Sequence, residues 1–154
     1  MSTSKVRCEL GAGTGAFRDR FLPGAFAIDL QASEEIDLLA DATKLPFKPE
    51  SVDELIVNNP YRYGFRTLEA GIEFLQEIQA VLKRGGCLVI RANRQNPFAH
   101  EDRIRQAASQ VGLTITVREI NAQIEFPGHI FLTTQGRETV PNLEFVISKE
   151  GAFK

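Results

Sequence analysis

The sequence lacks an apolar run that approaches the about 20 residues needed to span a bilayer, and its opening residues, MSTSKVRCEL, lack the apolar core of a signal peptide. It has only two cysteines, Cys8 and Cys87, and each lies inside a short apolar run. Such positions favour buried free thiols on separate strands over a disulfide or half of a metal site. These absences predict a cytoplasmic protein with no membrane partner and no metal.

Internal repeats, low-complexity tracts and linker-like segments are also absent. The 154 residues are enough for one domain with one sizeable core, so we expect residues 1–154 to form a single domain. A net charge of −2, with neither a dense basic stripe nor an aromatic ladder, argues against bulk nucleic-acid binding. Recognition of a single flipped base stays open.

Charge is unevenly distributed along the chain. Residues 29–54 hold eight acidic residues against two lysines, whereas residues 55–111 hold eight basic residues against five acidic ones. Two interpretations remain open. The segments either form two differently solvated faces, or the basic segment forms a rim that steers an anionic substrate toward a site in the second half.

Hydrophobic periodicity indicates strands alternating with helices. Short apolar runs predict strands, and apolar stripes at three- and four-residue spacing predict helices. The predicted strands are residues 6–10, 25–30, 36–40, 52–57, 87–92, 113–120 and 143–148, with a further short strand around 129–133, and the predicted helices are residues 15–22, 67–83 and 102–111. We expect Gly85-Gly86 to end the second helix, and no helix between the two closing strands. The pattern predicts an α/β sandwich whose early strands are parallel.

Polar residues follow several of the predicted strands directly. They are residues 9–15, Asp29, Asp41 and residues 58–61. Because the carboxyl ends of parallel strands share one edge of a sheet, a ligand is expected at this edge, where strand order reverses.

Residues 9–15 read Glu-Leu-Gly-Ala-Gly-Thr-Gly and follow the first predicted strand. Glycines allow the backbone to turn sharply and to approach a ligand closely. Their spacing differs from the G-x-G-x-x-G of dinucleotide-binding folds, which disfavours a nicotinamide-dependent oxidoreductase. The acidic Glu9 suits a ligand with an ammonium group better than one with a pyrophosphate.

With Asp29, and with Asp-Ala-Thr-Lys-Leu-Pro-Phe at residues 41–47 before the fourth strand, this motif resembles the class I S-adenosylmethionine-dependent methyltransferases. The resemblance implies a Rossmann-like three-layer α/β sandwich, with a mostly parallel sheet and an antiparallel closing strand. It also implies S-adenosylmethionine as cofactor. Asp29 would accept hydrogen bonds from the ribose hydroxyls, Asp41 would meet the adenine amino group, and the Ala42 amide a ring nitrogen. The full implied cofactor-binding set is Glu9, Gly11, Gly13, Asp29, Asp41, Ala42 and Asn58.

The reaction is indicated by residues 58–61, Asn-Asn-Pro-Tyr. Methyltransferases that act on amino groups of bases or glutamine carry Asn/Asp-Pro-Pro-Tyr/Phe at this place. The resemblance implies that Asn58 and Tyr61 are catalytic and orient a planar nitrogen acceptor. Asn59 replaces the first proline, which bears on the rigidity of the loop.

Members of this family usually carry an N-terminal helical segment that covers the cofactor, whereas here the first predicted strand begins about five residues into the sequence. We therefore expect a domain without the usual lid. A cover for the cofactor would then be supplied by residues 61–66 and 95–101, by a partner protein or by a second domain. The alternative function is a catalytically inactive S-adenosylmethionine-binding domain that is regulatory or depends on a partner.

Overall fold

The computed structural model describes residues 5–11, 16–29, 38–39, 44–61, 63–131 and 138–150. Within them, seven strands form one sheet in the order β3-β2-β1-β4-β5-β7-β6. The strands are β1 Arg7–Leu10, β2 Phe26–Asp29, β3 Leu38–Leu39, β4 Val52–Asn58, β5 Leu82–Ala92, β6 Thr114–Glu119 and β7 Leu143–Ser148, and the helices are α1 Ala16–Phe21, α2 Leu68–Val81, α3 Glu101–Val111 and α4 Ala122–Glu125. β7 runs antiparallel to both of its neighbours, and the pairs among β1 to β5 are parallel. The prediction of a mostly parallel sheet with an antiparallel closing strand is confirmed.

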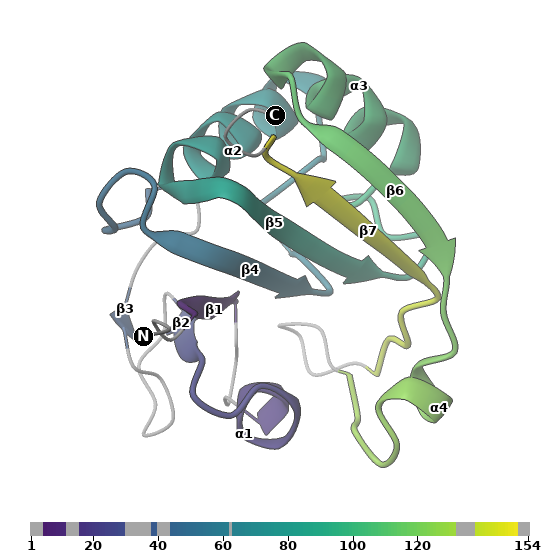
Figure 1. Ribbon diagram of the computed structural model, residues 1–154. Coiled ribbons are helices and arrows are strands. Elements are labelled where there is room, and N and C mark those ends of the chain that lie inside the picture. The colour runs from purple at the N-terminus through teal and green to yellow at the C-terminus, as the bar shows by residue number, and fades with distance from the viewer. Residues whose placement is uncertain are drawn as a thin grey trace.

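Helices lie on both faces of the sheet, with α2 and α3 on one and α1 and α4 on the other (Figure 1). Side chains alternate along β4, because successive residues of a strand point to opposite faces. Leu55 and Val57 therefore join the larger core under α2 and α3. Ile56 joins a smaller, phenylalanine-rich core with Phe17 and Phe131. This alternation produces the three layers that the sequence predicts.

The second predicted helix ends earlier than expected, and this is a correction. It stops at Val81, and Leu82 already has extended dihedrals and begins β5. Gly85 and Gly86 therefore lie inside a strand and do not terminate the helix. A Cβ on Gly86 would lie 2.9 Å from the Asp53 carbonyl oxygen of β4, so glycine is required there for the close approach of two backbones.

The segment between the two closing strands also differs from the prediction. It contains α4, which Asn121 caps by accepting hydrogen bonds from the Gln123 and Ile124 amides. Residues 129–131 form no strand, and residues 132–133 of the predicted strand lie outside the described residues. A four-residue helix is too short to produce an apolar periodicity in the sequence.

The remaining predicted strands and helices agree with the structure, to within a few residues at their ends, where it describes them. β7 has the predicted bounds, and α3 ends at Gly112, which adopts a left-handed conformation. The predicted third strand covers residues 36–40, of which the structure describes Leu38–Leu39 as β3. Cys8 and Cys87 are free thiols on different strands, the first fully buried and the second partly buried. Among the described helices, none has the length and hydropathy of a membrane span.

Candidate functional site

The sheet order reverses between β1 and β4, because β2 and β3 extend the sheet from β1 in one direction and β5 and β7 extend it from β4 in the other. Ligands of such sheets bind beyond the carboxyl ends of the strands at this point. The structure brings together two of the predicted site residues there. The Asn58 side chain, at the end of β4, donates a hydrogen bond from Nδ2 to Glu9 Oε2 at 3.1 Å.

Glu9 is a carboxylate in an unusual environment. The residue is 3% exposed, and among the described residues its Oε1 atom has no hydrogen-bond partner. Burial raises the pKa of Glu9 to about 7, although hydrogen bonds from the Asn58 side chain and the Arg18 backbone, and the charges of Arg18 and Arg91, act in the opposite direction. Because buried polar atoms are almost always paired, an unpartnered carboxylate oxygen here indicates a place for a donor from a ligand.

Gly11 follows β1 and begins the glycine-rich turn. Its φ of 63° is unfavourable for other residues, and a Cβ there would lie 2.8 Å from the Tyr63 hydroxyl oxygen. That hydroxyl donates a hydrogen bond to the Leu10 carbonyl oxygen at 3.5 Å. Burial, followed by the negative charges of Glu9 and Asp29, raises the pKa of Tyr63 well above its usual range. The loop after β4 thus contacts the turn after β1.

Tyr63 and Phe65 lie in the same loop after β4, but only Tyr63 contacts the glycine-rich turn, whereas Phe65 is fully buried in the core. No signal in the sequence separates the two aromatic residues, because both lie in the same loop. Asp29 lies at the end of β2, one position beyond the Leu10–Ile28 pair of the sheet, as predicted. Gly13, Asp41 and Ala42 lie outside the described residues.

A line of polar side chains crosses the sheet from Asn58 toward β6. Asn58, Arg91, Glu144 and Arg118 are register neighbours on β4, β5, β7 and β6. Arg91 donates to Asn58 Oδ1 at 3.4 Å and to Glu144 Oε2 at 2.9 Å, and Arg118 Nε donates to Glu144 Oε1 at 2.8 Å. Arg118 also makes two hydrogen bonds with Glu125 of α4. We call Glu9, Asn58, Arg91, Glu144 and Arg118 the polar line.

Sequence reasoning missed most of the polar line. It included Arg91 only among the basic residues of segment 55–111, and it did not single out Glu144 or Arg118. A charged residue at an inward position of an apolar strand is the signal that could have revealed Arg91 and Glu144. Although burial would raise the pKa of Glu144, hydrogen bonds and charge from Arg118 and Arg91 hold that pKa below its usual value.

Asn59 has a conformation that proline cannot adopt. Its φ is 51°, whereas the proline ring fixes φ near about −65°. The Asn59 amide donates to the Arg91 carbonyl oxygen at 2.8 Å, and its side-chain Nδ2 donates to the Thr139 carbonyl oxygen at 2.8 Å. Hydrogen bonds thus hold the loop where the motif of the family uses a proline.

The loops after β4 and β5 pack against each other at the same edge of the sheet. Tyr61 and Phe98 have ring centroids 5.3 Å apart, Asn96 donates to the Pro60 carbonyl oxygen at 3.1 Å, and the Phe65 amide donates to the Phe98 carbonyl oxygen at 2.8 Å. Residues 61–66 and 95–101, which the sequence proposes as a substitute lid, therefore contact each other through the residues that the structure describes.

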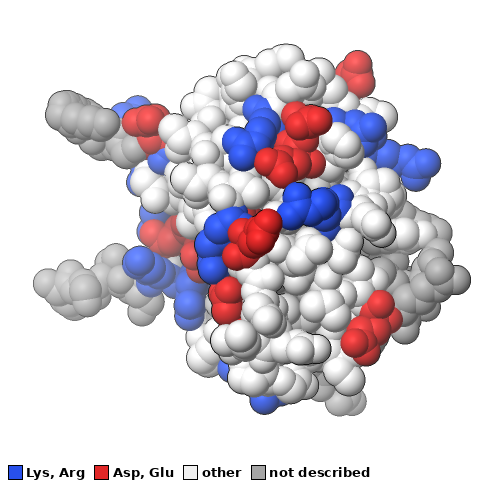
Figure 2. Space-filling model, turned by 90° about the vertical axis from the view of Figure 1, so that its right-hand side faces the viewer, with Lys and Arg blue, Asp and Glu red and all other residues white. Residues whose placement is uncertain are grey.

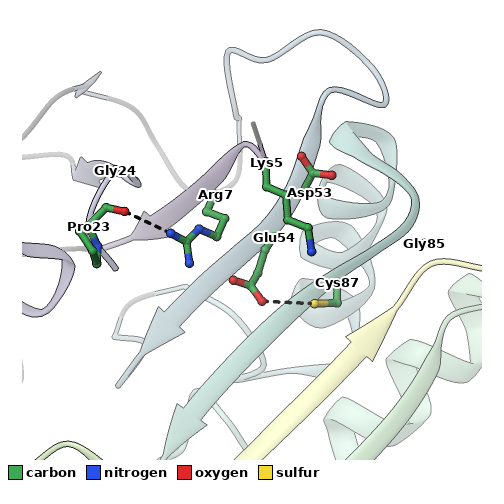
Figure 3. A pocket seen from close by; sticks show the side chains of 8 residues that line it. All are labelled: Lys5, Arg7, Pro23, Gly24, Asp53, Glu54, Gly85 and Cys87. Atoms are coloured by element: carbon green, nitrogen blue, oxygen red, sulfur yellow. Dashed lines mark hydrogen bonds between the residues drawn. The ribbon is translucent and has the colours of Figure 1, made fainter. Parts of the chain in front are cut away.

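A cavity of 730 Å³ lies at the opposite edge of the sheet (Figure 3). Its lining includes Arg7 of β1, Glu54 of β4 and Cys87 of β5, and the strands run away from it. Arg7 donates to the Pro23 carbonyl oxygen, and the Cys87 thiol lies 3.8 Å from Glu54 Oε2. This cavity is separate from the site at the carboxyl ends.

The basic residues of the second segment are largely paired with carboxylates. Ion pairs join Lys83 to Asp53, Arg84 to Glu50, Arg91 to Glu144, Arg94 to Glu119 and Arg105 to Glu101. On the face that carries β6 and α4, basic and acidic side chains are interspersed (Figure 2). This arrangement favours differently solvated faces over a basic rim that steers a substrate.

Comparison with known proteins gives one family match. A sequence profile described as a methyltransferase domain matches residues 8–90, which is more than half of the chain. The matched range includes Glu9, Gly11, Asp29 and Asn58. No curated protein sequence gives a significant match.

Solved structures show the same fold at low sequence identity. The Haemonchus contortus phosphoethanolamine N-methyltransferase 2, in complex with S-adenosyl-L-methionine, is 15% identical with a TM-score of 0.59, and the match covers 98% of this chain and 50% of that one. A Haloferax volcanii methyltransferase in complex with the Trm112 methyltransferase activator is 19% identical with a TM-score of 0.59, covering 100% and 85%. The Streptomyces coelicolor A3(2) geranyl diphosphate C-methyltransferase is 13% identical with a TM-score of 0.60, covering 96% and 73%. The chain thus spans half the length of the first of these proteins.

Proposed function

Because this chain belongs to the class I S-adenosylmethionine-dependent methyltransferase family, we propose that its glycine-rich edge transfers a methyl group to the nitrogen of a planar acceptor. The chain is a methyltransferase domain, and its cofactor is S-adenosylmethionine. The buried, unpartnered Oε1 atom of Glu9 is the observation that carries the cofactor site, and the Asn-Asn-Pro-Tyr loop after β4 supports the nitrogen acceptor. The matched structures include a nitrogen and a carbon methyltransferase, so the fold does not decide the acceptor.

The described residues fit this cofactor. Its methionine portion carries an ammonium group, and Glu9 Oε1 is a buried carboxylate oxygen that accepts no hydrogen bond from the residues that the structure describes. A charge-assisted hydrogen bond would satisfy both groups. Gly11 allows the left-handed turn after β1 and the close approach of the Tyr63 hydroxyl, which together shape the end of β1 beside Glu9. We propose that Gly13, Asp29, Asp41 and Ala42 complete the site, as the resemblance implies.

When bound, S-adenosylmethionine supplies a methyl group on a sulfonium sulfur that an acceptor lone pair can attack. The residues of this chain then need only to orient the cofactor and the acceptor toward each other and to exclude water. Asn58 orients Glu9, since its Nδ2 donates to that carboxylate while its Oδ1 accepts from Arg91. We propose Tyr61 as the aromatic residue that lies against the plane of the acceptor, with Phe98 packed behind it.

Isothermal titration with S-adenosylhomocysteine, the demethylated cofactor that retains the ammonium group, tests the cofactor site. We expect wild type to bind it and Glu9→Gln to bind about 10- to 100-fold more weakly, because the charge-assisted bond is lost. Glu119→Gln is the matched control, since the Glu119 side chain is 83% exposed and lies on the edge strand. Equal affinity of Glu9→Gln and wild type would remove Glu9 from the site.

Transfer of a tritiated methyl group to adenine- and cytosine-containing oligonucleotides, a glutamine peptide and histamine tests the planar nitrogen acceptor. Incorporation into any of these supports the proposal, whereas transfer only to carbon or oxygen acceptors would contradict it. The Haloferax relative was solved with an activator protein. Binding of S-adenosylhomocysteine without transfer to any acceptor would favour the inactive or partner-dependent alternative.

A further inference from the structure

Asn59 has a second unpartnered buried atom at this edge of the sheet. The residue is 7% exposed, and no hydrogen-bond partner for its Oδ1 atom occurs in the described ranges of the chain. An acceptor oxygen that is buried without a donor is costly, and native structures contain few of them. As with Glu9, the exception indicates a ligand.

The orientation of the Asn59 amide is fixed by its surroundings. The Thr139 carbonyl oxygen can only accept a hydrogen bond, so the side-chain nitrogen of Asn59 must face it, at 2.8 Å. The oxygen then points away from Thr139. The backbone is held by the bond to the Arg91 carbonyl oxygen and by a left-handed φ that asparagine tolerates.

Asn58 lacks such a free oxygen. Its nitrogen donates to Glu9, and its oxygen accepts from the Arg91 guanidinium, so both ends of the amide are engaged. Exchanging these ends would place an oxygen against the Glu9 carboxylate and a nitrogen against a cation. Of the two asparagines, Asn59 alone has an acceptor atom to offer.

Asn59 lies on the half of the sheet edge opposite to the half that holds Glu9 and Asp29. Glu9 and Asp29 lie on β1 and β2, whereas Asn59 is bonded to the end of β5 and to the segment that leads into β7. The Asn93 side chain donates to the Val140 carbonyl oxygen in the same region. The two unpartnered oxygens therefore belong to the two different halves of the sheet.

We propose that Asn59, at the position where the motif of the family has a proline, binds the methyl acceptor by accepting a hydrogen bond from its N–H group through Oδ1. This inference rests on the proposed function and deepens it. It restricts the acceptor to compounds that carry an N–H donor, such as an amide or an exocyclic amine.

A nuclear magnetic resonance titration of the full chain with two small amides tests the inference without knowledge of the natural acceptor. Acetamide carries N–H donors, and N,N-dimethylacetamide carries none. With asparagine labelled in its side-chain nitrogen, we expect acetamide to shift the Asn59 signal saturably and N,N-dimethylacetamide to leave it unchanged. Equal shifts with both compounds, or no shift with either, would overturn the inference.

Two variants separate acceptor binding from loop anchoring. Asn59→Gly tolerates the left-handed backbone and removes the oxygen, whereas Asn59→Asp keeps an oxygen and loses the donor to Thr139. Followed through the Arg91 backbone amide, acetamide affinity should fall about tenfold in Asn59→Gly and persist in Asn59→Asp. Equal losses in both variants would show that Asn59 only anchors the loop.

The cofactor serves as an independent readout. S-adenosylhomocysteine affinity should be unchanged in Asn59→Gly, because the hydrogen bonds of Asn59 go to Thr139 and Arg91, on the other side of Asn58 from Glu9. Failure of the wild type to bind S-adenosylhomocysteine would remove the proposed function. The acetamide titration would still decide the role of Asn59, since it is read on that residue and can be carried out without the cofactor.

Discussion

Two carboxylates on the same face of the sheet, Glu9 and Glu144, are both buried but have opposite surroundings. Glu144 receives hydrogen bonds from Arg91 and Arg118, and its pKa is lowered despite burial. Glu9 receives a single side-chain bond from Asn58, has a free oxygen, and its pKa is raised to about 7. Burial alone therefore does not distinguish structure from function. The satisfied carboxylate is part of the scaffold, and the unsatisfied one indicates a ligand.

The largest expected effect is on stability at the Glu144 end of the polar line. Glu144→Ala leaves the buried Arg91 guanidinium without its carboxylate, which typically costs about 3–5 kcal/mol. We expect a loss of this size in the free energy of unfolding, measured by urea denaturation. A loss in the free energy of unfolding below about 1 kcal/mol would show that the ion pairs of Glu144 contribute little to stability, so that Glu144 would not differ from Glu9 in this respect.

In contrast to Glu144→Ala, Glu9→Gln should not reduce the free energy of unfolding. It removes a buried group that is costly to ionise, so the free energy of unfolding at pH 8 should stay the same or increase, while S-adenosylhomocysteine binding weakens. Urea denaturation with and without S-adenosylhomocysteine separates the two effects, because a ligand stabilises only a protein that binds it. A clear loss of stability without ligand would place Glu9 in the scaffold with Glu144.

The two carboxylates should also differ in the pH dependence of stability. The folded pKa of Glu9, about 7, is above its unfolded value, so its contribution favours folding at low pH and is lost as pH rises from about 4.5 through 7. The folded pKa of Glu144 is lowered, so its contribution is present above the unfolded pKa and is lost as pH falls through the folded one. Glu9→Gln should remove the decline between pH 4.5 and 7, measured by urea denaturation across this range.

The ionisation of Glu9 should also make cofactor affinity depend on pH. An ammonium ligand requires ionised Glu9, so S-adenosylhomocysteine should bind more tightly as pH rises through about 7. Titration calorimetry at pH 6 and pH 8 measures the change, and Glu9→Gln is the control that should lack it. An affinity independent of pH in the wild type would contradict the assignment of the ammonium to Glu9.

The smallest effect is expected for an exposed ion pair near the same strands. Arg94 and Glu119 lie 3.4 Å apart, with side chains 57% and 83% exposed. Arg94→Ala should change the free energy of unfolding by less than about 0.5 kcal/mol, because solvent screens such pairs. A larger loss in urea denaturation would show that exposure is a poor guide to which arginine–glutamate pairs matter here.

The sequence determined the periodic elements and the edge of the sheet where the site lies. Strands and helices such as β7 and α3 are visible because their apolar spacing reflects the geometry of one element and the face that it buries. The glycine-rich turn, Asp29 and Asn58 were predicted at a common edge because parallel strands align their carboxyl ends. Short or irregular elements such as α4 were missed, since one turn carries too few residues for a pattern.

Only the tertiary structure decided how the polar atoms are paired. Whether Glu9, Asn58 or Asn59 retains a free oxygen depends on Arg91, Glu144 and Thr139, which lie on other strands and are distant in the sequence. Their proximity is set by sheet order and register, and no local motif encodes either. The sequence thus indicated the family and the cofactor, and the pairing of side chains across the sheet separated scaffold from site.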